Sequence, residues 1–182
     1  MGLFDLFKKK EEPAYDPTNI SIKDLDKGFV FDYDLKTWIV KEVYEYDWGN
    51  NNFTKEFKVD SGDEVWYLHL EDDDEIFITV TKKVKIRAID EDLPERIKKK
   101  EKPPKKLEYK GHTLYRDEET MGYFKPVDKE TDDWDELISW EYYDDEDQYV
   151  LSIEQWGDDE FEAAFGKVAK EHQFSNILPG NN

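Results

Sequence analysis

Residues 64–80 read Glu64-Val65-Trp66-Tyr67-Leu68-His69-Leu70-Glu71-Asp72-Asp73-Asp74-Glu75-Ile76-Phe77-Ile78-Thr79-Val80. Two runs rich in aromatic and β-branched residues flank a short acidic break at Asp72-Asp73-Asp74. Apolar alternation on both sides of a polar break is typical of a β-hairpin. A similar arrangement returns at residues 148–161, where the break is Gly157-Asp158-Asp159. We therefore expect a mainly β protein with two related halves.

The composition is that of an acidic chain that can still build a core. Of 182 residues, 37% are hydrophobic and 15% are aromatic. Each buried aromatic side chain removes roughly 150–250 Å² from water, so few of them are needed. Disordered acidic sequences are poor in aromatic residues, which sets this chain apart from them. The length suits one sizeable domain or two small ones.

The formal net charge is −20, from 46 acidic and 26 basic residues. A field of this sign repels nucleic acid and anionic lipid, and it attracts polyamines or basic protein surfaces. We therefore expect no direct nucleic-acid binding, and a basic protein surface or a polyamine as the partner. The simpler interpretation of the charge is a solvated, highly soluble surface.

The types of residue present also indicate the cellular compartment of the protein. There is no Cys, which excludes disulfides, thiolate metal sites and Cys nucleophiles, and fits a reducing cytoplasm. No stretch approaches the roughly 20 apolar residues of a membrane span, and no signal peptide is recognisable. We expect a cytoplasmic protein.

Residues 1–10 predict a short amphipathic helix. Its apolar side carries Leu3, Phe4, Leu6 and Phe7, and its C-terminal end carries Lys8, Lys9 and Lys10, where the helix dipole favours cations. Such a helix could lie on an anionic membrane surface, here the inner face of the membrane. About two turns are too short to be stable alone, so a membrane, a partner or the protein's own core would have to hold it.

We divide the chain into four parts. Residues 1–27 are the N-terminal amphipathic helix and a linker, residues 28–93 a first β module, residues 94–106 a Lys/Pro connector, and residues 107–182 a second β module. In the first module we expect strands at residues 29–33, 38–48 and 53–59, in the hairpin, and at residues 84–88. The long strand should present Trp38, Val40, Tyr44, Tyr46 and Trp48 on one face. Breaks every 8–12 residues indicate an antiparallel meander, barrel-like or sandwich-like.

The second module repeats this pattern. The connector holds a Lys run and Pro103-Pro104, which favour an extended, solvated segment. Residues 107–115 then echo residues 31–39, and Lys110-Gly111 suits a tight hairpin turn. Further strands are expected at residues 137–143 and 149–156. Residues 160–164 could begin a helix or form a strand, and the echo of the first half favours a strand.

Several of these stretches resemble a known family. They are Tyr33 or Tyr109 followed by a turn and an apolar pair, the run Trp66-Tyr67-Leu68-x-Leu70-Glu71, and the later Leu151-Ser152-Ile153-Glu154-Gln155-Trp156. Together with Trp134-Asp135-Glu136 and Phe165-Gly166-Lys167 they look like the bacterial domain-of-unknown-function family 4178, over roughly residues 29–179. The family tends to show Asp-Gly in the first hairpin, where this chain has Asp34-Leu35, which leaves that turn's geometry open.

The resemblance implies little chemistry. Family members resemble accessory proteins associated with small membrane proteins and with polyamine-type enzymes. The resemblance implies no catalytic residues, and we expect none.

Other candidate chemistry in the sequence is weak. The three histidines, His69, His112 and His172, lack the spacing of a metal site, and no cofactor is expected. The Asp and Glu clusters lack the ordered ligand pattern of a Ca²⁺ loop and are more typical of strand breaks. Carboxylates such as Glu141 and Glu154 could form a glycosidase-like pair, but among 46 acidic residues such a pair arises by chance.

The most informative constellation combines tryptophans with neighbouring acids. Aromatic faces beside carboxylates suit a cationic group through cation–π contact and ion pairing. The alternative is that these tryptophans form a core between the two halves. The candidate surface for a cationic partner is Trp134, Asp135, Glu136, Trp140, Glu141, Glu154 and Trp156.

We therefore expect a non-enzymatic, acidic binding or adaptor protein that meets a basic partner and contacts the membrane surface through its N-terminus. Two alternatives remain at this point. One is a nucleic-acid mimic whose charge occupies a DNA-binding protein, and the other is a polyamine- or cation-binding protein.

Overall fold

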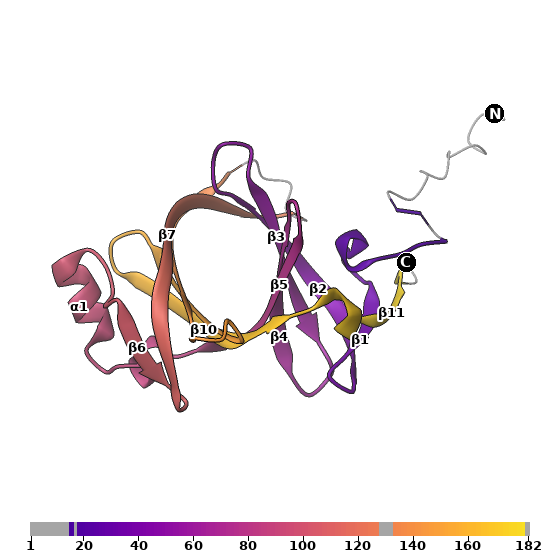
Figure 1. Ribbon diagram of the computed structural model, residues 1–182. Helices are drawn as coiled ribbons and strands as arrows, with labels where there is room; N and C mark the ends of the chain where they lie inside the picture. Colours follow the sequence, from indigo (N-terminus) through magenta and orange to yellow (C-terminus); the bar gives the residue numbers. More distant parts are fainter. Residues whose placement is uncertain (1–14, 17, 128–132, 181–182) are drawn as a thin grey trace.

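All eleven strands of this protein belong to one antiparallel sheet in the computed structural model, which describes residues 15–16, 18–127 and 133–180 (Figure 1). The predicted helix at residues 1–10 lies outside the described residues. The first half contributes β1 (Val30–Tyr33), β2 (Lys36–Asp47), β3 (Phe53–Asp60), β4 (Val65–Asp72) and β5 (Ile76–Val84). The second half contributes β6 (Lys106–Tyr109), β7 (His112–Pro126), β8 (Asp135–Tyr143), β9 (Tyr149–Trp156), β10 (Glu160–Ala169) and the last strand, β11 (Ser175–Leu178).

The strand order confirms two related antiparallel meanders. Strands β1 to β5 are neighbours in chain order, and so are β6 to β10. The halves meet at equivalent strands, because β5 pairs with β10 and β2 pairs with β7. These two seams close β2–β3–β4–β5–β10–β9–β8–β7 into a ring, seen end-on in Figure 1. Strand β6 continues the sheet at one end, and β1 and β11 continue it at the other.

A β-bulge in β2 decides which side chains enter the ring. The pairing of β2 with β3 shifts register between Val40 and Glu42. Because side chains alternate between faces, one extra residue exchanges the faces of everything that follows. The prediction that Trp38 to Trp48 share one face is therefore wrong: Trp38 lies in a core outside the ring, whereas Tyr44 and Tyr46 line the ring's interior.

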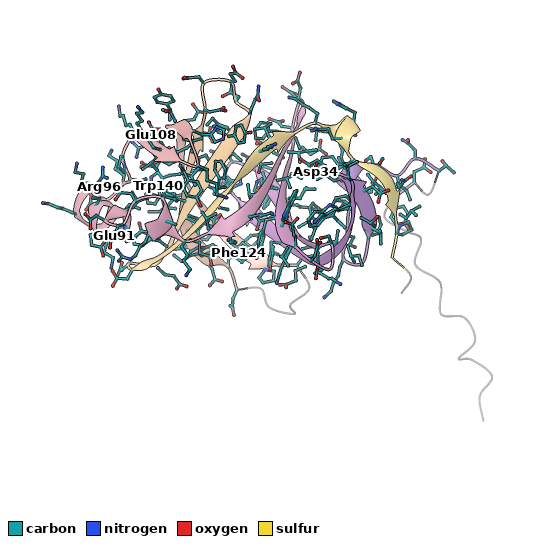
Figure 2. All side chains as sticks on the ribbon, turned by 90° about the horizontal axis from the view of Figure 1, so that it is seen from below. Asp34, Glu91, Arg96, Glu108, Phe124 and Trp140 are labelled. Carbon is teal, nitrogen blue, oxygen red and sulfur yellow. The ribbon has the colours of Figure 1, made fainter. Side chains whose placement is uncertain are left out.

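The ring has two hydrophobic cores, and both lie on its outer face. The first core packs β2 to β5 against β1, the 3₁₀ turn η1 (Ile22–Asp24) and Phe174; its largest buried members are Trp38, Phe31, Phe57, Ile22, Leu68 and Ile78. The second core packs β7 to β10 against β6 and α1 (Leu93–Lys100); it includes Trp140, Tyr142, Leu93, Ile97, Leu114, Leu151 and Ile153. In Figure 2, Trp140 and Arg96 lie on the side of the molecule that holds the second core, and Asp34 lies on the opposite side, which holds the first core.

The helix α1 corrects the prediction of an extended connector at residues 94–106. Leu93 and Ile97 are one turn apart and fully buried in the second core. Pro94 sits in the first turn, where its missing N–H costs nothing, and the Lys run ends the helix, where the dipole favours cations. Burial of one apolar stripe therefore outweighs the charge repulsion from which an extended chain was predicted.

Two further strand predictions have definite outcomes. The strand expected at residues 84–88 is wrong, because β5 ends at Val84 and Ile86–Ala88 form the 3₁₀ turn η2 against the second core. The strand favoured over a helix at residues 160–164 is confirmed, since Glu160–Ala169 is β10. Its Gly166 is required: an added Cβ would lie 1.9 Å from the Val80 carbonyl oxygen.

Both predicted hairpin turns are tight. Lys110 and Gly111 have φ of 48° and 84°, as a type I′-like turn requires. Asp34 and Leu35 adopt the same left-handed backbone, with φ of 51° and 62°, although neither is Gly. The turn is kept because Tyr33 pairs with Lys36 in register and the strands on both sides are held by the first core.

Candidate functional site

The ring opens at one end into a cavity of about 880 Å³, which we call the wide mouth. Seven of its described lining residues are acidic, six are aromatic and one, Lys83, is basic. The acidic residues are Glu42, Glu56, Asp135, Glu136, Glu154, Glu160 and Glu162. The aromatic residues are Tyr44, Tyr46, Tyr67, Phe124, Trp134 and Trp156.

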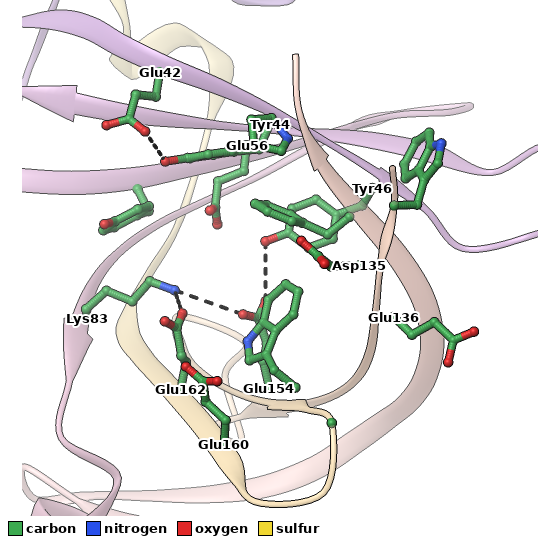
Figure 3. Close-up of a pocket in the computed structure, with 16 residues that line it drawn as sticks. Glu42, Tyr44, Tyr46, Glu56, Lys83, Asp135, Glu136, Glu154, Glu160 and Glu162 are labelled. Carbon is green, nitrogen blue, oxygen red and sulfur yellow. Dashed lines mark hydrogen bonds and ion pairs between the residues drawn. The ribbon is translucent and has the colours of Figure 1, made fainter. Parts of the chain in front are cut away.

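Side chains from four strands meet at the base of the wide mouth (Figure 3). The Lys83 ammonium of β5 forms an ion pair with Glu162 of β10 and lies 4.0 Å from an Oε of Glu154 on β9. The Tyr46 hydroxyl of β2 donates a hydrogen bond of 3.4 Å to the other oxygen of Glu154. The Glu154 side chain is only 13% exposed, so its charge is poorly screened by solvent.

Glu56 of β3 points into the same space and is electrostatically strained. Burial and the nearby charge of Glu154 raise the pKa of Glu56 to about 8. Burial also raises the pKa of Glu154, although Lys83 opposes this shift. Burial alone would lower the pKa of Lys83, but the surrounding carboxylates, Glu154 foremost, raise it. The base of the wide mouth therefore holds more negative charge than its single lysine can balance.

Aromatic rings form the walls above these carboxylates. Phe124 of β7 packs edge-to-face against Trp156, with ring centroids 5.2 Å apart, and lies 5.1 Å from both Tyr44 and Tyr46. The indole Nε1 of Trp156 is buried and has no hydrogen-bond partner among the described residues. At the rim, the ammonium of Lys125 sits 4.3 Å above the Trp134 ring. That contact shows directly that a cation fits an aromatic face here.

A small pocket of about 20 Å³, which we call the neck, shares Glu56 and Glu154 with the wide mouth and shares five lining residues with a further cavity of about 280 Å³, which we call the smaller cavity. Glu56 and Glu154 line the neck from one side, and His69 and Glu141 line both the neck and the smaller cavity. Burial lowers the pKa of His69 to about 4. A neck of this size admits little more than one water-sized group, so a larger ligand would stay in the wide mouth.

The structure brings together five of the seven residues predicted to form a cationic-partner surface. Trp134, Asp135, Glu136, Glu154 and Trp156 line the wide mouth. Trp140 does not, because it is fully buried in the second core. There its indole donates a 3.0 Å hydrogen bond to Glu119.

Glu141, the remaining member of that predicted surface, lies farther along the interior. It lines the neck and the smaller cavity, where its carboxylate accepts a 2.6 Å hydrogen bond from Tyr143. Glu141 and Glu154 do share the neck, as the idea of a glycosidase-like pair required, but the neck is too narrow for a sugar ring.

Sequence reasoning missed the members contributed by the first half, namely Glu42, Tyr44, Tyr46, Glu56, Tyr67 and Lys83. In β3, Glu56 and Lys58 alternate with the buried Phe57 and Val59, which is the signal of a polar row opposite a core face. It was not used, because a polar face is ordinarily assigned to solvent. Phe124 was missed together with the far part of β7, whose acidic residues break the apolar alternation.

Two other predicted features lie elsewhere. The residues predicted as a membrane or partner hook, Leu3 to Lys10, are outside the described part of the chain. The three histidines are dispersed: His69 lines the neck, the ring centroid of His112 lies 3.7 Å from that of Tyr149, and His172 lies in an exposed turn. Among the described residues no group of three or more metal-binding side chains is placed to hold an ion, and no helix could span a membrane.

Comparison with known proteins places the chain in a family. The family model described as "Domain of unknown function (DUF4178)" matches residues 26–171, which include both halves of the ring. The chain belongs to the DUF4178 family. It is also 30% identical over 184 residues to an uncharacterized protein of Aquifex aeolicus (strain VF5), covering 98% of this chain and 99% of the relative. No solved structure matches the chain significantly.

Proposed function

We propose that this DUF4178 protein is a non-catalytic binding protein whose wide mouth takes an ammonium or guanidinium group from a basic partner protein. One observation carries the proposal: seven acidic residues and six aromatic rings line a cavity that has a single lysine among its described lining residues. Carboxylates supply ion pairs to a cation, and aromatic faces attract it through the ring quadrupole.

Buried charge gives the wide mouth its selectivity for cations. The raised pKa of Glu56 means that its carboxylate is destabilised by burial and by Glu154. A cation placed near both carboxylates would relieve that repulsion, whereas an anion would increase it. The electrostatic gain in binding free energy is larger in the wide mouth than on the open surface, because the walls exclude part of the solvent.

The size of the wide mouth suits a side chain presented on a protein or peptide. About 880 Å³ is within the range of cavities that hold small ligands. A lysine or arginine side chain would reach the carboxylates with its head group while its methylene stem packs along Tyr46, Phe124 and Trp156. A free polyamine is the alternative occupant, since it offers the same ammonium chemistry without the attached protein.

Calorimetry with a tetralysine peptide tests the proposal. We expect binding at low ionic strength that weakens as NaCl rises, because the contact is partly electrostatic. Glu154→Gln should weaken it about tenfold and Trp156→Leu about fivefold, as expected for a lost charge-assisted hydrogen bond and a lost cation–π contact.

Two controls make that experiment decisive. Glu171→Gln removes one charge at an exposed position outside the cavity and should leave the affinity unchanged. Tetraglutamate should not bind. If Glu171→Gln weakens tetralysine binding as much as Glu154→Gln does, general surface charge explains the binding and the proposal fails. Spermidine in place of tetralysine tests the alternative occupant.

For residues 1–10 we propose contact with an anionic membrane surface from the cytoplasmic side. The support is the sequence pattern, in which four apolar residues precede three lysines. Deletion of residues 2–10 should abolish co-sedimentation with vesicles that contain phosphatidylglycerol. Unchanged co-sedimentation of the deletion variant would contradict the proposal.

A further inference from the structure

The base of the wide mouth contains three carboxylates and one ammonium group in close reach. Glu56 projects from β3, Glu154 from β9 and Glu162 from β10, and the lysine is Lys83 on β5 (Figure 3). Lys83 is already engaged by Glu162 and by Glu154, at 4.0 Å from the latter. Other titratable groups line the same interior. They are Glu42, Tyr44 and Tyr46 on β2, Tyr67 and His69 on β4, Asp135, Glu136 and Glu141 on β8, and Glu160 on β10.

Glu56 differs from the other two carboxylates because, among the described residues, no ammonium or guanidinium nitrogen forms an ion pair with it, although Lys83 and Tyr46 both oppose the rise in its pKa. Glu162 has the Lys83 ammonium, and Glu154 has the same lysine and the Tyr46 hydroxyl. Glu56 and Glu154 both line the neck, where solvent is scarce. Two carboxylates that share a partly buried site do not both ionise easily, so one of them retains a proton to a higher pH. The raised pKa values of Glu56 and Glu154 agree with this arrangement.

We infer that a cation entering the wide mouth expels a proton from the Glu56–Glu154 pair, so that the site exchanges one proton for the charge of its ligand. The inference rests on the proposed function, because it describes how that site responds to its cation. The carboxyl O–H bond breaks, the proton passes to solvent, and the carboxylate then accepts a hydrogen bond from the incoming ammonium group. The net charge of the site is unchanged by the exchange.

Proton exchange has a signature that simple charge attraction lacks. While the pair holds its proton, each unit of pH should tighten binding by up to tenfold, since one proton is released for each cation bound. The affinity should stop rising with pH above pH 8, where the Glu56–Glu154 pair is already ionised in the free protein. Attraction to a permanently ionised surface would give affinity that is nearly constant from pH 6 to pH 9.

Calorimetry of the full-length chain with tetralysine, at equal ionic strength, measures the proton directly. Titrations at pH 7 in phosphate and in MOPS differ in observed heat in proportion to the protons released to the buffer. We expect close to one proton per peptide bound at pH 7 and close to none at pH 9. Glu56→Gln should release none at either pH and should bind about tenfold more weakly than the wild type at pH 8. Glu171→Gln should behave as the wild type.

The outcomes separate this inference from the proposed function. Absence of binding heat at every pH in both buffers would overturn the proposed function and the inference with it. Binding with equal heats in the two buffers at pH 7 would overturn the inference alone. The wild-type titrations decide the matter even if Glu56→Gln fails to fold, and Glu154→Gln provides a second variant that should also lose the released proton.

Discussion

At the scale of single residues, Glu56 links the site to the stability of the fold. Its pKa in the folded state is about 8, because burial and Glu154 disfavour the ionised form, against an ordinary value of 4.5. Between these values the folded protein holds a proton that the unfolded chain has released. Stability contributed in this way is present below pH 4.5 and is lost as the pH rises toward 8.

Glu56→Gln should therefore stabilise the protein at high pH. At pH 9 we expect its free energy of unfolding to exceed that of the wild type by more than about 1.4 kcal/mol, the equivalent of one pKa unit. At pH 4 the two proteins should agree within about 0.5 kcal/mol. Urea denaturation at the two pH values measures both differences. A constant difference across the pH range would show that ionisation of Glu56 is not its cause.

His69 should stay neutral well below its ordinary range. Burial in the neck lowers its pKa to about 4, so the folded protein lacks a proton that the unfolded chain binds below pH 6.5. We expect its ring carbon resonance to titrate near pH 4 in the folded protein and near pH 6.5 in urea. Stability should fall as the pH drops from 6.5 to 4 through this residue. A folded-state midpoint near 6.5 would mean that the neck is well solvated.

At the scale of elements, the β1–β2 turn carries a measurable strain. Leu35 is fully exposed and has a left-handed φ of 62°, which costs a residue with a Cβ roughly 1–2 kcal/mol. Leu35→Gly should raise the free energy of unfolding by about 1 kcal/mol. Leu35→Ala keeps the Cβ and should change stability by less than about 0.5 kcal/mol. Equal gains from both variants would assign the effect to the lost leucine side chain instead of the backbone.

The seam between β5 and β10 depends on one glycine. A Cβ at Gly166 would lie 1.9 Å from the Val80 carbonyl oxygen and 2.6 Å from the Thr81 Cα, so the backbone would have to move. Gly166→Ala should destabilise the protein by about 1–3 kcal/mol, the usual cost of overpacking. Lys167→Ala, on the next and exposed residue of the strand, should cost less than about 0.5 kcal/mol. Guanidinium denaturation of Gly166→Ala and Lys167→Ala measures both changes in the free energy of unfolding.

The sequence predicted most strands but misplaced the faces of the longest ones. Alternation and turn residues are local signals, and they were sufficient for β3, β4, β8 and β9. A bulge such as the one between Val40 and Glu42 cannot be recognised from the composition of the strand. Its effect is that Tyr44 and Tyr46 lie in the interior of the ring and not on the expected core face. The helix α1 was missed because Leu93 and Ile97 are a short apolar signal beside a strong Lys and Pro pattern.

The candidate site could be predicted only in the half where tryptophans stand beside acids. The predicted cationic-partner surface contains five of its residues, including Glu154 and Trp156. The contribution of the first half depends on the β2–β7 and β5–β10 seams, which join residues far apart in the chain. No local pattern encodes such pairings, because they result from two modules each completing the other's sheet.

At the scale of the whole molecule, the two seams of the ring differ in strength. Seven residue pairs join β5 to β10, whereas four join β2 to β7. Pro126, in the shorter seam, has no N–H to donate. Native-state hydrogen exchange should therefore show faster exchange for amides of the β2–β7 seam than for those of the β5–β10 seam. Equal protection would mean that the ring opens only through global unfolding.

The position of the two cores, outside the ring, separates what holds the protein together from what it can recognise. In most small barrels the inward side chains are the core, so a change of lining is also a change of stability. Here both cores lie outside the ring and the residues that line the wide mouth belong to neither of them, so most of the lining could be exchanged without opening a cavity in a core. Related chains could thus keep one framework and vary the side chains that line its interior. The lining of this protein could be redesigned by substitution in the same way.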